Sequence, residues 1–161
     1  ELPYGTAQEA LIMASIVEKE TGIADERRDV ASVFVNRLQR GMRLQTDPTV
    51  IYGITGGQGT LGRGLRQSEL RADTAYNTYV IDGLPPTPIA NPGRASIRAA
   101  LNPAPNPPPG DPICQALDDP TQNCLYLFYV LINEEGGHAF AATGEQHQEN
   151  VNRAAALGLL D

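Results

Sequence analysis

The sequence predicts an α+β fold that is mainly helical and carries one small antiparallel β-hairpin. Apolar residues recur at helical intervals after capping signals near both ends of the chain. A continuous apolar and aromatic run, 126–132, precedes a turn and a second short apolar run at 138–142, as in a hairpin. The length of 161 residues suits one domain with its own core.

Two helices are expected in the first quarter of the chain. Thr6 and Glu9 have the spacing of a capping box, and the helix that follows is predicted to end at Gly22. Asp25 is predicted to cap a second helix that ends at Gly41. The apolar face of this second helix is formed by Val30, Val33, Phe34 and Leu38.

The next segment is less regular. Residues 50–52 follow Asp47 and Pro48, a start that suits a helix, but their β-branched side chains suit a strand, so both assignments stay open. Residues 53–64 hold six glycines and are predicted to form a mobile surface loop that can border a cleft. A short helix and a turn are expected at 68–79.

Proline and glycine determine the path of the remaining segments. Residues 83–86 are expected to be extended, and a small helix is predicted at 95–101. The proline-rich residues 103–112 read as a surface excursion. After the hairpin, a second capping box at 143–146 starts a last helix that ends at Gly158.

The charge balance excludes some classes of partner. Twelve Lys and Arg against nineteen Asp and Glu give a net charge of -7, which argues against a nucleic-acid binder that works by counterion release. No apolar run approaches the roughly 20 residues that span a bilayer, and no signal peptide opens the chain. Because the chain begins at Glu1, we expect it to be a fragment whose targeting or membrane segment lies elsewhere.

Cys114 and Cys124 are the two cysteines of the chain, and they flank a polar loop. No other metal ligands have suitable spacing nearby, so a disulfide is predicted. Closing a loop of about ten residues contributes roughly 2.5 to 3 kcal/mol in the chain-entropy model and indicates an oxidising compartment. Two free buried thiols are the alternative.

Two carboxylates near the end of the first helix differ in their surroundings. On a helical wheel, Glu20 lies at the centre of the arc of large apolar side chains, and Glu18 lies roughly 160° away. Desolvation raises the pKa of a carboxyl group, so Glu20 is the candidate general acid. Alternatively, Glu20 lies beyond the buried part of the helix, where it meets solvent or pairs with Lys19 or an Arg of the second helix.

Other chemistries have weaker support. The motifs of serine hydrolases, zinc peptidases, P-loops and dinucleotide-binding folds do not occur, and no cofactor is expected. His138 and His147 are expected to bind backbone or substrate groups rather than a metal. Tyr76, Asn77 and Tyr79 offer the flat faces, amide and hydroxyls that sugars require, although half-buried aromatic residues at a turn are an equal alternative.

Ordered segments over nearly the whole chain carry a resemblance. They are Ala14–Thr21, Ala31–Leu38, Leu44–Gly53, Tyr76–Tyr79, Gly83–Pro86, Ile89–Gly93 and Gly137–Phe140 with His147 and Asn150. Together they resemble the MltG (YceG-like) endolytic murein transglycosylases. The resemblance implies a single lysozyme-like catalytic domain over 1–161, with Glu20 as the catalytic residue. It also implies an extracytoplasmic protein whose anchor, a single N-terminal helix in the cytoplasmic membrane, and LysM-like module are absent here.

The resemblance also implies a substrate and a set of binding residues. Glu20 would cleave the β-1,4 bond between N-acetylmuramic acid and N-acetylglucosamine, leave 1,6-anhydro ends, and so terminate or trim nascent strands. Wall-synthesis enzymes are the expected protein partners. The expected substrate-binding residues are Gln45, Asp47, Tyr76, Asn77, Thr78, Asn91, His138 and His147. The alternatives are a hydrolytic muramidase with Asp47 as the second carboxylate, and a glycan-binding scaffold without catalysis.

Overall fold

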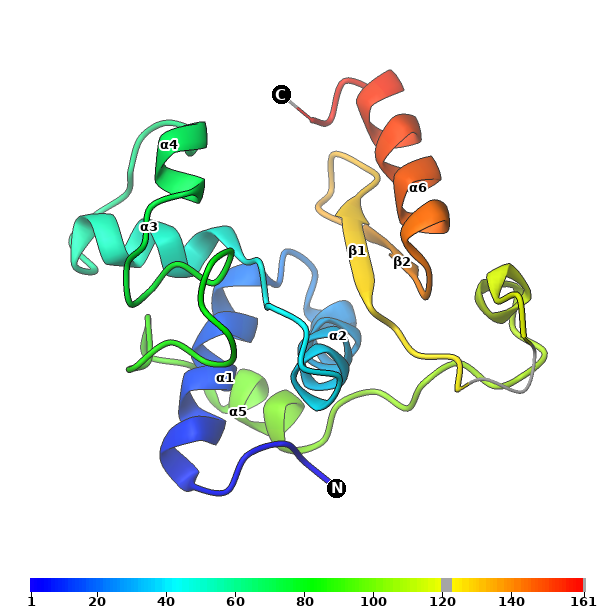
Figure 1. The fold of residues 1–161 in the computed structure, drawn as a ribbon, viewed down its shortest axis with the longest axis horizontal. Coiled ribbons are helices and arrows are strands. Elements are labelled where there is room, and N and C mark those ends of the chain that lie inside the picture. The colour runs from blue at the N-terminus through cyan, green and yellow to red at the C-terminus, as the bar shows by residue number, and fades with distance from the viewer. Residues whose placement is uncertain (120–122, 161) are drawn as a thin grey trace.

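A computed structural model describes residues 1–119 and 123–160 (Figure 1). Its helices are α1 Ala7–Glu20, α2 Arg27–Gln39, α3 Asp47–Thr55, α4 Gln67–Leu70, α5 Arg94–Leu101 and α6 Gly144–Ala156, with 3₁₀ turns η1 Ala24–Glu26 and η2 Pro112–Ala116. Strands β1 Phe128–Leu131 and β2 His138–Ala141 pair antiparallel. The mainly helical fold with one hairpin is therefore confirmed.

Helix α1 begins as predicted and ends two residues before Gly22, with Thr21 as an extended C-cap and without a left-handed glycine. The Thr6 hydroxyl accepts a hydrogen bond from the Glu9 backbone N–H, and the Glu9 carboxylate accepts one from the Thr6 N–H, which completes the capping box. The helix buries the face from Ile12 to Val17 and ends at Glu20. Glu20 is thus the last helical residue, directly after the buried face.

Helix α2 begins differently from the prediction. Asp25 lies in η1, and α2 starts at Arg27 without a side-chain cap. The neighbouring Glu26 carboxylate is used elsewhere, since it accepts hydrogen bonds from the backbone N–H and the ring of His138. Gly41 ends the helix as expected, with a positive φ of 67° that glycine adopts without strain.

Residues 50–52, for which the sequence allowed either a helix or a strand, lie in helix α3. Pro48 lies in its first turn, where a missing N–H costs nothing, and Gly56 closes it with φ 63°. These end signals outweigh the β-branched residues between them. Gly53 consequently lies inside the helix, and the glycine-rich loop begins only at Gly56.

The core lies where α1 packs against α2 and α5. Met13, Ile16 and Val17 of α1 are fully buried there, together with Phe34 of α2 and Ala100 of α5. We call residues 1–101 the helical region. Figure 1 shows the hairpin and α6 on one side of it.

Residues 126–157, which contain the hairpin and α6, form what we call the C-terminal unit. Helix α6 packs on both strands. Its cap is the Thr143 hydroxyl, which accepts from the Gln146 N–H, while the Gln146 side chain accepts from the Ala142 N–H. The strands are shorter than predicted, but Leu127 and Ile132 extend the backbone pairing beyond β1.

Polar contacts attach the C-terminal unit to the helical region. Arg37 Nε donates to the Leu127 carbonyl at 2.7 Å, and Asn36 Nδ2 donates to the Tyr126 carbonyl at 2.8 Å. At the opposite end of the hairpin, a Cβ on Gly22 would lie 2.9 Å from the Gly136 carbonyl oxygen, so this close approach requires glycine. Tyr129 and Phe140 of the unit also pack against the core, with the Tyr129 ring edge-on to Phe34 at 6.0 Å, so the unit docks through both polar and aromatic contacts.

The predicted disulfide between Cys114 and Cys124 is present, with a Cα–Cα distance of 5.4 Å. It lies in the excursion that connects α5 to the hairpin. Residues 120–122 of the loop between the cysteines, and Asp161, lie outside the described residues. No helix within 1–119 or 123–160 is both long and apolar enough to cross a membrane.

Candidate active site

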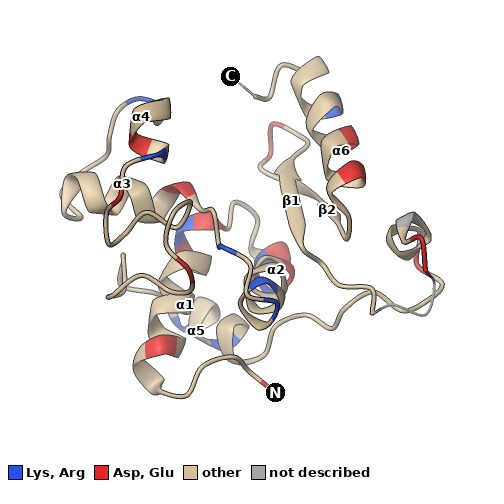
Figure 2. Ribbon diagram, in the orientation of Figure 1, with Lys and Arg blue, Asp and Glu red and all other residues tan. Residues whose placement is uncertain are grey.

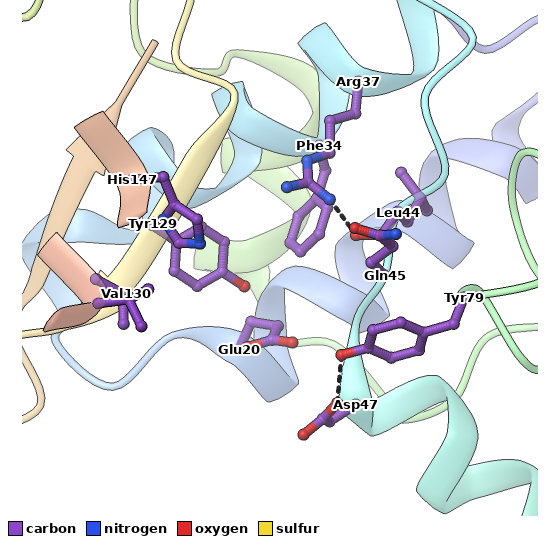
Figure 3. Close-up of a pocket in the computed structure, with 11 residues that line it drawn as sticks. Glu20, Phe34, Arg37, Leu44, Gln45, Asp47, Tyr79, Tyr129, Val130 and His147 are labelled. Atoms are coloured by element: carbon purple, nitrogen blue, oxygen red, sulfur yellow. Dashed lines mark hydrogen bonds between the residues drawn. The ribbon is translucent and has the colours of Figure 1, made fainter. Parts of the chain in front are cut away.

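A cavity of about 470 Å³ lies between the helical region and the C-terminal unit (Figure 3). We call it the Glu20 cavity. Its walls are Glu20, Phe34, Arg37, Leu44, Gln45, Asp47, Tyr79, Tyr129, Val130, His147 and Val151. Carboxylate, amide, phenol and imidazole groups thus face one space, although they come from segments far apart in the sequence.

Glu20 presents its carboxyl group to this cavity. The Thr46 hydroxyl donates a hydrogen bond to it, and the Tyr129 hydroxyl points toward it (Figure 3). Burial raises the pKa of Glu20, and the nearby Asp47 charge raises it further, against the lowering effects of Thr46, Tyr129 and His138. A raised pKa favours the protonated carboxyl that a general acid requires.

Glu18 has the opposite environment. Its carboxylate accepts hydrogen bonds from the Ser96 hydroxyl and the Gly93 N–H, and these bonds lower its pKa. Glu18 therefore fixes the start of α5, and it does not line the Glu20 cavity. The helical wheel also separated the two carboxylates, since it placed Glu20 among large apolar side chains and Glu18 away from them.

Buried hydroxyl groups hold Thr46 in place. The Thr46 N–H donates to Thr78 Oγ1 at 3.0 Å, and Thr78 Oγ1 lies 2.9 Å from Thr49 Oγ1. All three side chains are buried, so their hydroxyls have few other partners. Thr78 supports the residue that contacts Glu20, and it lies behind the cavity wall.

Gln45 has an unusual backbone conformation. Its φ is 52°, and it is the one non-glycine residue with positive φ in the described part of the chain. Such a conformation costs about 1–2 kcal/mol for a side chain other than glycine. Its N–H donates to the Thr78 carbonyl, and its side chain lines the Glu20 cavity. Strain is thus retained at the cavity wall.

Asp47 and Tyr79 form a hydrogen-bonded pair on the same wall. The Tyr79 hydroxyl donates to Asp47 Oδ1 at 2.6 Å. Burial and the Asp47 and Glu20 charges raise the pKa of Tyr79, so the phenol stays protonated and keeps donating. A second carboxylate therefore faces the space in front of Glu20.

The C-terminal unit and Arg37 form the opposite wall. The His147 ring stacks on Phe128 at 5.0 Å, its Nδ1 atom is buried without a partner in the described residues, and burial lowers its pKa. Arg37, only 8% exposed, donates to the Leu127 and Leu44 carbonyls. The His147 side chain thus lines the cavity, but its unpaired Nδ1 atom is shielded.

Three predicted binding residues, Gln45, Asp47 and His147, thus line the cavity with Glu20. Four others lie outside its wall. The Tyr76 ring packs on the Tyr52 ring, and its hydroxyl forms a hydrogen bond with the Thr87 hydroxyl. The fully buried Asn77 donates to three backbone carbonyls and accepts from the Tyr79 N–H. Asn91 is exposed in the loop before α5, and Thr78 lies behind the wall as described.

His138 also lies outside the wall, yet it is connected to it. Its Nδ1 is 2.8 Å from the Glu26 carboxylate, and its ring meets Tyr129 edge-on at 5.2 Å. The described residues contain no group of three or more His, Cys, Asp or Glu side chains that could hold a metal ion.

Sequence reasoning missed Tyr129, Arg37 and Thr46 as site residues. Tyr129 lies in the run predicted as a strand, and Arg37 and Thr46 lie within the quoted segments 31–38 and 44–53. For Tyr129 the available signal was a hydroxyl between two apolar neighbours, Phe128 and Val130, whereas Arg37 and Thr46 have polar neighbours and gave no such signal. It did not indicate which cavity these residues would meet.

The YceG-like family model matches residues 1–109, about two thirds of the chain. The chain belongs to the YceG-like family. The match ends before the hairpin, so it covers α1 to α5 and one wall of the Glu20 cavity.

Relatives of this YceG-like chain are named endolytic murein transglycosylases. The protein of Bacillus subtilis (strain 168) is 46% identical over 93 residues, which cover 58% of this chain and 25% of the relative. That of Streptococcus pneumoniae serotype 2 (strain D39) is 32% identical over 151 residues, 91% of this chain and 23% of the relative. The chain thus spans about a quarter of their length.

A solved structure of a YceG-like protein from Listeria monocytogenes resembles this one with a TM-score of 0.71 and 36% sequence identity. The similarity covers 90% of this chain and 40% of that one. It therefore extends beyond the residues of the family match into the C-terminal unit.

Proposed function

We propose that this chain is the catalytic domain of an endolytic murein lytic transglycosylase, with Glu20 as its catalytic residue. The observation that carries the proposal is a desolvated glutamate with a raised pKa in a polar cavity. The names of the relatives supply the substrate class. A lysozyme-like fold, a single domain over 1–161 and an envelope location through a membrane anchor outside this chain belong to the same proposal.

The proposed reaction needs one acid/base. Protonated Glu20 gives its proton to the oxygen of the β-1,4 bond between N-acetylmuramic acid and N-acetylglucosamine as that bond breaks. The Glu20 carboxylate then takes the proton of the C6 hydroxyl, whose oxygen attacks the anomeric carbon. The product is a 1,6-anhydro end, and water is not consumed. Cleavage of nascent strands in this way would terminate or trim them beside wall-synthesis enzymes.

The remaining wall groups are assigned to binding and to charge stabilisation. The Gln45 amide and the His147 imidazole, which line the cavity, suit the N-acetyl and hydroxyl groups of the sugars. The Tyr129 and Thr46 hydroxyls stabilise the Glu20 carboxylate after it has lost its proton. Tyr76, Asn77, Thr78, Asn91 and His138 remain proposed binding residues on the resemblance alone.

One observation favours a second candidate, a hydrolytic muramidase. Asp47 lines the same cavity, and Tyr79 holds its carboxylate toward the space in front of Glu20. In that position it could activate a water molecule as the second carboxylate of a glycosidase. The product would then be a reducing end, which is one water heavier than the anhydro end.

The test compares wild type, Glu20→Gln and Asp47→Asn on isolated murein glycan, with mass spectrometry of the new ends. Anhydro ends from wild type and from Asp47→Asn, and none from Glu20→Gln, are expected. Reducing ends that disappear in Asp47→Asn would instead establish the muramidase. Full activity of Glu20→Gln excludes both mechanisms, and binding without new ends identifies a scaffold. Glu18→Gln is the matched control, because it removes the other carboxylate of the same helix turn.

A further inference from the structure

A second cavity, of about 370 Å³, lies under the glycine-rich loop. We call it the Lys19 cavity. Lys19 and Pro48 line it, and they are the chain neighbours of Glu20 and Asp47, which line the first cavity. Neighbouring Cα atoms are about 3.8 Å apart. The linings of the two cavities are therefore adjacent at two places in the chain, so one extended ligand can reach both.

The chemistry of the Lys19 cavity differs from that of the Glu20 cavity. Its floor is largely apolar and is formed by Pro48, Ile51, Tyr52 and Ile89, and the loop adds Leu61. Asp, Glu, Asn and Gln, the side chains that most often bind sugar hydroxyls, are absent from its lining. The Thr55 hydroxyl already donates to the Ile51 carbonyl and accepts from the Gly57 N–H.

Lys19 is the cation of this cavity that is open to a ligand. It is the single lysine of the chain, it is exposed, and no carboxylate of the described residues lies within 4.0 Å of it. The adjacent Glu18 is bonded to Ser96 and Gly93. The other cation, Arg63, is held by both oxygens of Glu69 at 2.6 and 2.9 Å.

The roof of the cavity depends on glycine. Gly57 has φ +79°, and a Cβ on it would lie 2.9 Å from the Tyr52 ring. The loop can approach the floor this closely only without a side chain at this position. The cavity is therefore a formed feature of the loop, with an apolar floor, a close roof and one charged edge.

We propose that the Lys19 cavity binds the peptide stem carried by the muramic acid residues of a murein strand, with an aliphatic side chain on the floor and a peptide carboxylate at Lys19. This inference rests on the proposed function, because the stem leaves the sugar chain beside the bond that is cleaved. An aliphatic surface with one open cation complements a short peptide with carboxylates. A further sugar would find few neutral polar side chains there, because the lining offers no side-chain amide and the Thr55 hydroxyl is already bonded, which leaves the hydroxyls of Tyr52 and Thr60.

Binding can be measured without cleavage. Protein labelled with ¹³C at lysine Cε gives one lysine side-chain signal, which reports on Lys19 alone. A synthetic stem pentapeptide is expected to shift this signal in a saturable way, and the same peptide with amidated carboxylates to bind at least about tenfold more weakly, as expected for a lost charged hydrogen bond. A shift with peptide-free glycan but not with the peptide would indicate a sugar site, and no shift with either ligand would also overturn the proposal.

Cleavage supplies a second measurement that separates this inference from the proposed function. We compare kcat/KM on peptide-bearing strands with kcat/KM on strands from which an amidase has removed the peptides. The ratio of the first to the second is expected to fall about tenfold in Lys19→Gln. Lys19→Arg should restore most of it, and Arg153→Gln on α6, the matched control, should leave it at the wild-type value. An unchanged ratio in Lys19→Gln contradicts the peptide site. If wild type cleaves neither substrate, the proposed function fails while the binding experiment still decides the inference.

Discussion

The helical region and the C-terminal unit form opposite walls of the Glu20 cavity, but different forces hold them. The helical region is built on an apolar core in which Met13, Ile16 and Phe34 are almost fully buried. The C-terminal unit is attached through hydrogen bonds from Asn36 and Arg37 and through the pair of Glu26 with His138, and only the half-buried rings of Tyr129 and Phe140 pack on the core. The apolar core thus positions Glu20, and a unit with more polar attachments completes its environment.

This difference has a consequence for the chemistry. The carboxyl group, its Thr46 partner and the Asp47 charge all belong to the helical region. The Tyr129 hydroxyl and the His147 imidazole belong to the C-terminal unit. Movement of the C-terminal unit would therefore change the desolvation of Glu20 without displacing it.

The largest expected effect is on the apolar core. Ile16→Ala should lower the free energy of unfolding by about 2–5 kcal/mol, because it leaves a cavity among packed side chains. Val130→Ala, on the half-buried strand β1, should cost about 1 kcal/mol. Urea unfolding measures both. Equal losses would mean that the two walls are held by the same kind of packing.

The next effect concerns the attachment itself. Arg37→Gln removes the guanidinium that serves the Leu127, Arg43 and Leu44 carbonyls, and it should cost about 2–3 kcal/mol. Hydrogen exchange should accelerate more in β1 and β2 than in α1. The exposed Arg43→Gln is the control and should change stability by less than about 0.5 kcal/mol. Uniform acceleration over the chain would contradict a separately attached unit.

A smaller effect concerns strain in the helical wall. Gln45→Gly should raise the free energy of unfolding by about 1 kcal/mol, because glycine adopts φ 52° without a clash. Gln45→Ala retains the strained backbone and gains no such stability. Both variants lose the amide, so both should cleave glycan more slowly. Thermal unfolding together with the cleavage assay separates strain from binding.

The smallest expected effect is on the pH profile. Tyr129 and Thr46 each lower the pKa of Glu20, so Tyr129→Phe and Thr46→Val should both raise it. The acid acts in its protonated form, and activity is lost as the pH rises through this pKa. The alkaline limb of kcat/KM should therefore move to higher pH in each variant. A limb that moves to lower pH would show that Tyr129 does not stabilise the carboxylate.

The helical region and the C-terminal unit differ less in the distribution of their charged residues than in their packing. Acidic and basic residues both occur on α2 of the helical region and on α6 of the C-terminal unit (Figure 2). Neither helix presents a surface of one sign, and the net charge of the chain is -7. Substrate selection is thus expected from individual groups such as Lys19 and His147 rather than from a general field.

Much of the helical region could be predicted because its signals are local. The capping box of α1, the glycine that ends α2 and the choice of Glu20 over Glu18 all follow from residues within a few positions of one another. Where two local signals conflicted, as between the proline start and the β-branched residues of α3, the sequence could not decide. The start of α2 was wrong because a 3₁₀ turn, closed by the hydrogen bond from the Glu26 N–H to the Ile23 carbonyl, precedes the helix, so that Glu26 rather than Asp25 is its N-cap.

The sequence by itself determined the class of fold, the hairpin, the disulfide and the position of one carboxylate beside an apolar face. Only the tertiary structure decided what that carboxylate meets. Tyr129 and His147 reach the cavity from the far end of the chain, and Thr46 contacts Glu20 because the buried Thr78 holds it. Local spacing determines the faces of a helix, whereas desolvation depends on which distant segments cover them.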